Sequence, residues 1–317
     1  MVKLIKKVPI PMAGLMLALA SLGNLVLSYG SGYRNVFGLL SAILLILLVG
    51  KVLIDGGAVA EDMKNPAIAS VAPTFSMGIM ILSTYIKPFN ATLAFTAWMI
   101  GLILHGLFII YFTKAFLLRF EMKKVLTSYF VVYVGIVVGS VTAPAYNMQN
   151  LGQLIFWFGF ISYLILLPVV IYRVLIIKGI PEPLLPTITI FAAPASLCLA
   201  GYISTFSVKS NLLITFMMVL AMVMTLSVLL YLPRLLKLKF YPSYSAFTFP
   251  LVISGIATKL ANGYLVKSGN TIDMLKYIVR FQEALSIAIV LYVLIRYIMF
   301  LTSDLKATKA PAAPITK

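Results

Sequence analysis

The sequence has few charged side chains and little of the chemistry that enzymes use. Charged residues make up 10% of the 317 residues, and the chain holds eight acidic residues, one histidine and one cysteine. A soluble domain needs far more surface charge, and one cysteine excludes a disulfide framework or a site of four thiolates. No residues are spaced as metal ligands, a phosphate-binding glycine loop or a nucleophile with its base. We therefore expect no catalytic residues, no metal, no cofactor and no enzymatic activity.

The sequence has instead long runs of apolar residues. Hydrophobic residues make up 62% of the chain, and the mean hydropathy is +1.07. A helix needs about 20 apolar residues to cross the hydrocarbon core of a membrane. Ten such runs occur, at about 10–29, 35–54, 68–86, 90–113, 125–145, 151–177, 184–206, 211–233, 241–262 and 278–301. The linkers are short, so we predict an all-α polytopic membrane protein with ten transmembrane helices in five helical hairpins, forming one domain at 1–302.

Basic residues predict how these helices are oriented. With the N-terminus placed in the cytoplasm, 18 of the 25 Lys and Arg lie at cytoplasmic ends and five at the opposite ends. Positive charge is enriched on the cytoplasmic side of membrane proteins. We expect a multi-pass protein of the cell (plasma) membrane with both termini in the cytoplasm and a short cytoplasmic tail at 303–317. The net charge of +17 is scattered over segment ends without a basic patch, so we expect no nucleic-acid partner.

Prolines separate the odd-numbered runs from the even-numbered ones. Each odd-numbered run contains a proline, namely Pro11, Pro73, Pro144, Pro194 and Pro250, whereas only Pro168 lies well inside an even-numbered run. Proline kinks a helix, and lipid tolerates the freed carbonyl only where protein or a watery cavity accepts it. We therefore predict two concentric rings, with kinked odd-numbered helices around a central pore. Proline is also commoner in membrane helices generally, which is the alternative explanation.

Small and hydroxylated side chains accompany these prolines, and almost no carboxylate lies in the odd-numbered runs. Such a lining would suit an anion that loses part of its hydration shell. We predict that the pore is lined or kinked by Pro73, Thr74, Pro144, Pro194, Ser196, Thr248 and Pro250. The same small residues would also allow close packing of helices without a pore.

The last two runs contain three ionisable residues, which are costly inside a membrane and therefore candidates for function. Arg280 and Glu283 are one helical turn apart near the outer end of run ten, and Lys259 lies at similar depth in run nine. Lys259 and Glu283 would form an ion pair that joins the last hairpin, or Lys259 would attract anions to the outer pore. His105 and Cys198 are expected to be packing residues.

Two motifs resemble a known family. FAAPASLCLAGYIS at 191–204 and YSAFTFPLVISGIA at 244–257 are similar to segments of the tellurite-resistance/dicarboxylate transporter (TDT) family, which includes bacterial tellurite-resistance proteins and the plant slow anion channels. The similarity in run order, hairpins and prolines covers nearly the whole chain. It implies ten helices around a pseudo-fivefold axis, a homotrimer with one pore per subunit, and a phenylalanine on the ninth helix that plugs the pore. That phenylalanine corresponds to Phe249, immediately before Pro250.

Three functions compete at this point. The first is an anion-selective channel that conducts small inorganic or organic anions through a central pore occluded by Phe249. The alternative is a transporter, either a proton-coupled carrier of C4-dicarboxylates such as malate or a carrier of tellurite or sulfite. Coupling to protons needs a titratable group, for which Glu283 is the first candidate and His105 the second. The third is a membrane scaffold or sensor that transports nothing.

Overall fold

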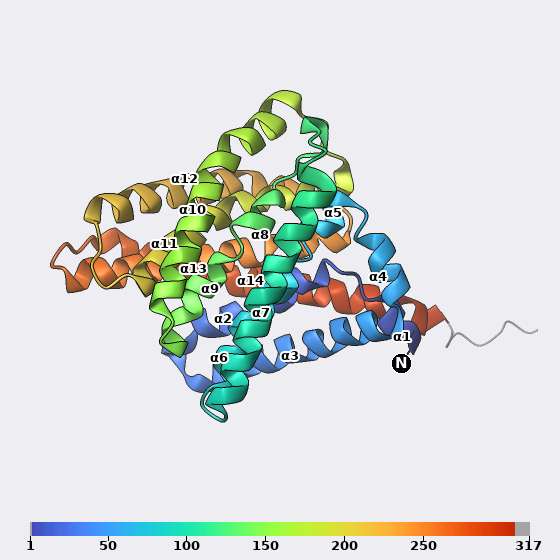
Figure 1. The fold of residues 1–317 in the computed structure, drawn as a ribbon, viewed down its shortest axis with the longest axis horizontal. Coiled ribbons are helices and arrows are strands. Elements are labelled where there is room, and N and C mark those ends of the chain that lie inside the picture. The colour runs from blue at the N-terminus through green and yellow to red at the C-terminus, as the bar shows by residue number, and fades with distance from the viewer. Residues whose placement is uncertain (1, 308–317) are drawn as a thin grey trace, which may run out of the picture.

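The structure is a computed structural model that describes residues 2–307 (Figure 1). Every element within these residues is a helix and none is a strand, so the predicted all-α class is confirmed. The two ends of the described chain lie together, where α1 (Val2–Lys7) packs against α14 (Asp273–Ala307). The last helix runs into the first part of the predicted tail at 303–317, and the rest of that tail lies outside the described residues.

Five long helices from the even-numbered runs form the outside of the bundle. These outer helices are α3 (Ser31–Ile54), α7 (Ala91–Phe112), α10 (Gln149–Tyr172), α12 (Asn211–Leu235) and α14. Only 22–33% of the residues in their most apolar stretches are buried. Their exposed side chains are large and apolar, for example Leu39, Ile103 and Leu230. A largely apolar exposed surface of this kind fits contact with lipid.

The odd-numbered runs form the inner segments, and each is interrupted. Their pieces are α2 (Met12–Leu25), which follows a turn; α5 (Pro66–Ala69) with α6 (Thr74–Ile86); α8 (Tyr129–Tyr133) with α9 (Val137–Thr142); the 3₁₀ helix η6 (Glu182–Ala192) with α11 (Ala193–Thr205); and the 3₁₀ helix η7 (Pro242–Phe247) with α13 (Phe249–Lys267). The share of buried residues in the most apolar stretch is 72% for Pro66–Ile86, 78% for Glu182–Thr205 and 56% for Pro242–Lys267. These values exceed those of the outer helices, so the prediction of an inner and an outer ring is confirmed.

The helix packing closes the inner ring. α2 packs against α6, α6 against α9, α9 against α11, α11 against α13, and α13 against α2 again. Each inner segment also packs against the outer helix that follows it in the chain, which gives the five predicted hairpins. Short helices connect these parts: η1 (Leu27–Tyr29), α4 (Gly56–Asp62), η2 (Thr113–Leu117), η3 (Met122–Lys124), η4 (Ala143–Tyr146) and η5 (Arg173–Ile177).

All ten predicted runs are helical in the described chain, but they differ in length. Eight segments are long and apolar enough to cross a membrane, and Met12–Leu25 is a shorter apolar helix. The fifth run is divided into α8, α9 and η4, none of which is long enough by itself. The described chain is therefore a multi-pass helical membrane protein.

Proline explains four of the five interruptions. Pro11 and Pro73 precede the first residues of α2 and α6, while Pro194 and Pro250 lie in the first turns of α11 and α13. Proline fits there because a first-turn N–H has no intrahelical partner to lose.

The fifth inner segment differs from the expectation, because its break falls at Gly135 instead of Pro144. Pro144 lies in η4, near the end of the segment. At the break, the Gly135 N–H points to the carbonyls of both Phe130, at 3.3 Å, and Val131, at 3.2 Å. A Cβ at position 135 would collide with the Val131 carbonyl and approach Met77 Sδ to 2.8 Å. Only glycine fits this backbone, and the proline pattern gave no sign of it.

Candidate functional site

Two cavities lie inside the ring, and all five inner segments contribute to each. The narrow cavity has a volume of about 50 Å³ and is formed where the inner segments are broken. The wide cavity has a volume of about 390 Å³ and is lined from the C-terminal halves of α2 and α6 and from the N-terminal half of α13. Because helix breaks leave space between backbones, the prolines and Gly135 position the narrow cavity.

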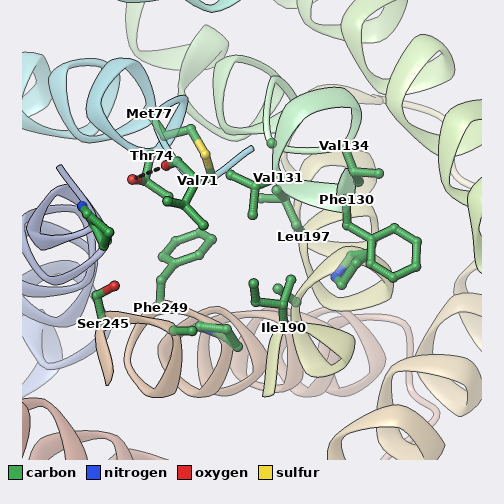
Figure 2. Close-up of a pocket in the computed structure, with 17 residues that line it drawn as sticks. Val71, Thr74, Met77, Phe130, Val131, Val134, Ile190, Leu197, Ser245 and Phe249 are labelled. Carbon is green, nitrogen blue, oxygen red and sulfur yellow. Dashed lines mark hydrogen bonds between the residues drawn. The ribbon is translucent and has the colours of Figure 1, made fainter. Parts of the chain in front are cut away.

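Phe249 and Leu197 border both cavities and therefore lie between them. Phe249 is 6% exposed and begins α13, directly before Pro250. Figure 2 shows its ring pointing away from its own helix into the cavity, toward Val71 and Thr74 on the opposite side. The ring thus occupies the space between two hollow regions instead of packing outward against lipid.

The narrow cavity is almost wholly apolar. Thr74 and Ser245 supply its hydroxyl groups, and both are occupied within the protein. Thr74 donates to the Val71 carbonyl at 2.7 Å, and Ser245 donates to the Pro242 carbonyl at 3.4 Å. A space of this volume has room for only a few water molecules, and they would find few polar partners in its walls.

The structure divides the other predicted lining residues into two groups. Thr74, Pro194 and Pro250 line the narrow cavity. The linings of the two cavities do not include Pro73, Pro144, Ser196 or Thr248. Ser196 donates to the Ala192 carbonyl at 2.8 Å, and Thr248 donates to the Ser245 carbonyl at 2.6 Å. In these two residues the hydroxyl satisfies backbone carbonyls where the inner segments are broken.

Lys259 lies between the last two helices and the end of α2. Its ammonium group donates to Glu283 Oε1 at 2.7 Å, to Ser28 Oγ at 2.7 Å and to the Leu25 carbonyl at 2.8 Å. The Lys259 side chain is 34% exposed and that of Glu283 is 5% exposed. These three acceptors use all three N–H donors of the ammonium group. Lys259 does not line either cavity.

Glu283 has a second partner, since Tyr29 donates its hydroxyl to Oε2 at 2.7 Å. Both carboxylate oxygens are thus bonded, which is what a buried charge requires. Arg280 is exposed, and no described ion pair joins it to Glu283. The arrangement links α13, α14 and the α2–α3 connection.

His105 and Cys198 are packing residues in the structure. His105 is fully buried; its Nδ1 lies 2.9 Å from Ser76 Oγ, and its Nε2 lies 3.0 Å from the Val132 carbonyl. Cys198 is buried and free. Within the described residues, no three His, Cys, Asp or Glu side chains come together as a metal site.

Sequence reasoning missed one charged residue of the wide cavity. Arg34, at the start of α3, lines this cavity, which Phe249 also borders. In the sequence it is one of the five basic residues at the ends opposite the cytoplasmic ones. The one sequence signal for Arg34 is that this charged residue lies only three residues after the start of a helix. The direction of its side chain depends on contacts with α2 and α6, which the sequence does not reveal.

The fold and these cavities define a multi-pass helical membrane protein with hollow space enclosed by a ring of broken helices. The family model described as voltage-dependent anion channel (SLAC1) matches residues 8–298. The chain therefore belongs to this family, which confirms the TDT resemblance of the motifs at 191–204 and 244–257. The family consists of channels and transporters of anions, not of enzymes. No curated protein matches the sequence.

Proposed function

We propose that this protein is an anion-selective channel in which Phe249 occludes the path between the two cavities. Small anions would pass from the wide cavity to the narrow one along the axis of the inner ring. The observation that carries the proposal is that Phe249 borders both cavities, which all five inner segments line. Family membership supports anions as the transported class.

The chemistry of the narrow cavity supports occlusion. An apolar constriction resists ions because it offers no polar atoms to replace their hydration shell. The Phe249 ring fills the space between the two cavities, and Pro250 restricts the backbone next to it. Neither lining contains a carboxylate, so no fixed negative charge repels an anion.

The same linings argue against a proton-coupled carrier. Coupling needs a group that changes protonation while it faces the substrate path. Arg34 is the one ionisable residue in the two linings, and a guanidinium stays charged at any physiological pH. Glu283 and His105, the candidates from the sequence, lie outside both linings. The linings therefore favour a channel over a proton-coupled carrier of dicarboxylates such as malate.

The test is the current through purified protein in planar bilayers, with wild type and Phe249→Ala compared side by side. We expect Phe249→Ala to carry at least about tenfold more anion current, which corresponds to a barrier lowered by about 1.4 kcal/mol. The reversal potential should follow the chloride gradient and should not move when a pH gradient is applied. Chloride, nitrate, sulfite and malate tested in turn would rank the permeant anions.

Phe247→Ala is the matched control. Phe247 lies two residues away and is fully buried, but its ring packs on Tyr244 at 4.8 Å and borders neither cavity. The Phe247→Ala variant loses the same kind of side chain without opening the path between the cavities, so its anion current should equal that of wild type. A folded Phe249→Ala protein that conducts no better than Phe247→Ala would refute the occlusion.

We also propose that both termini lie in the cytoplasm and that the protein is a homotrimer in the plasma membrane. The 18 basic residues at the predicted cytoplasmic ends support the orientation, and the family resemblance supports the trimer. Cysteine labelling at Lys7 and at Lys267 from each side of the membrane tests the orientation. Native mass spectrometry tests the trimer.

A further inference from the structure

Arg34 carries a positive charge that the described chain leaves uncompensated. Its Nε donates to Asn24 Oδ1 at 2.8 Å, and its Nη2 donates to the carbonyl and hydroxyl of Thr84 at 3.2 and 3.3 Å. The Tyr85 ring lies 3.9 Å from the guanidinium carbon. All of these partners are neutral, and none of the ion pairs within residues 2–307 includes Arg34.

The guanidinium also has donors to spare. A guanidinium has five N–H groups in a planar fork. The contacts with Asn24 and Thr84 involve Nε and Nη2, and no described acceptor is bonded to Nη1. The Tyr85 ring and these contacts hold the fork in place, since an aromatic face stabilises a cation stacked on it. A fixed, partly unused fork in a cavity wall is suited to bind an anion.

A second observation at the same cavity also points to a ligand. Ser21, on α2, is 1% exposed and lines the wide cavity, yet its hydroxyl has no hydrogen-bond partner. A buried polar group without a partner is costly, so a bound group that the hydroxyl can reach from the cavity wall would relieve this cost.

Asn24 adds a third donor on the same helix. It lies three residues after Ser21, which places both on one helical face, and both line the wide cavity. Because Arg34 Nε can only donate, it takes the amide oxygen of Asn24, and the amide nitrogen points elsewhere. No hydrogen bond from that nitrogen occurs in the described part of the chain. Its two N–H groups are therefore available to a ligand.

We propose that Arg34, Ser21 and Asn24 form a binding site for a small inorganic anion in the wide cavity. All three supply donors, and the cavity lining contains no carboxylate that would favour a cation. Phe249 borders the same cavity, so an anion bound there lies in the cavity that the ring separates from the narrow one. This inference rests on the proposed channel function for its role in conduction, but binding itself does not require conduction.

The first experiment measures binding without transport. The melting temperature of the purified protein is followed while nitrate replaces gluconate at constant ionic strength. Wild type should be stabilised with a saturating dependence on nitrate, because a ligand that binds only the folded state raises its stability. Arg34→Gln should weaken nitrate binding, so that the half-saturating nitrate concentration rises on the order of tenfold or more, since a charged donor is lost.

Two further variants keep the test decisive. Ser21→Ala removes a hydroxyl that bonds nothing in the protein, so it should fold as well as wild type while binding nitrate several-fold more weakly. Lys267→Gln is the control, because Lys267 is an exposed cation at the end of α13 that lines neither cavity. It should leave the nitrate dependence unchanged. If Ser21→Ala and Arg34→Gln bind nitrate as wild type does, or if Lys267→Gln weakens binding equally, the site is refuted.

The second experiment separates this site from the channel itself. Arg34→Gln is introduced into Phe249→Ala, and chloride conductance is measured against chloride concentration. The expected result is a higher half-saturating concentration and a lower conductance at low chloride. If Phe249→Ala conducts and Arg34→Gln changes neither quantity, the site is wrong and the channel stands. If no variant conducts but nitrate stabilises wild type through Arg34, the site stands and the proposed function fails.

Discussion

Replacing Lys259 with methionine should destabilise the protein by about 3 kcal/mol, the lower end of the cost of breaking a buried ion pair. The change leaves the Glu283 carboxylate, 5% exposed, with Tyr29 as its remaining partner. Two further hydrogen bonds, to Leu25 and Ser28, are lost with the ammonium group. The lower end applies because the Lys259 side chain is 34% exposed, so water enters its place and screens the charge.

Glu283→Gln should cost less, about 1–2 kcal/mol, because the amide oxygen still accepts one hydrogen bond and no charge is left buried. Lys259 keeps Leu25 and Ser28 as acceptors in that variant. In the double variant no unpaired carboxylate remains, so it should be more stable than the sum of the single changes predicts, by about 2 kcal/mol. This difference between the double variant and the sum of the single variants is the coupling free energy, and it distinguishes an ion pair from two independent residues.

Equilibrium unfolding in mixed detergent micelles would measure these free energies. Lys276→Met is the matched control, because its ion pair with Asp273 spans 3.3 Å and both side chains are at least 51% exposed. It should change stability by less than about 0.5 kcal/mol. Additive costs for Lys259→Met and Glu283→Gln would refute the ion pair as a stabilising contact. An anion conductance altered by Lys259→Met at unchanged stability would instead support its role as an attractor of anions.

Two other predictions concern the backbone and pH. Gly135→Ala should prevent folding or sharply lower the yield of folded protein, because its Cβ meets the Val131 carbonyl, whereas Gly106→Ala on α7 meets nothing within 4 Å and should stabilise by up to about 1 kcal/mol. Size-exclusion profiles and melting temperatures check both, and a well-folded Gly135→Ala would contradict the account of the break. The hydrogen bond from Lys51 lowers the pKa of the Asp55 carboxyl below its usual 3.8. Since the folded pKa is lowered, this contribution to stability is complete above about pH 5 and is lost as the pH falls through the lowered pKa. The melting temperature of Asp55→Asn should therefore fall less than that of wild type between pH 5 and pH 3. Equal falls would show that the Lys51–Asp55 pair does not contribute to stability.

Much of the fold could be predicted because the membrane restricts the choices. Lipid offers no hydrogen bonds to the backbone, so ten apolar runs imply helices, and short linkers imply hairpins. Prolines such as Pro73 and Pro194 also marked the inner segments, because an interrupted helix needs protein or a cavity around it. The Gly135 break could not be foreseen, since Gly135 is one of several glycines in the inner runs, and only the folded backbone brings position 135 against the Val131 carbonyl and Met77 of α6.

The sequence by itself determined the class, the order of inner and outer helices, and the family, because apolar runs, prolines and short motifs are properties of neighbouring residues. Only the tertiary structure decided which polar residues face the cavities. Ser196 and Thr248 looked like lining residues and instead bond the backbone, while Arg34 and Ser21 reach the wide cavity from two different helices. The direction of a side chain inside a bundle depends on how helices far apart in the chain rotate against one another, and that rotation is set by packing across the closed ring.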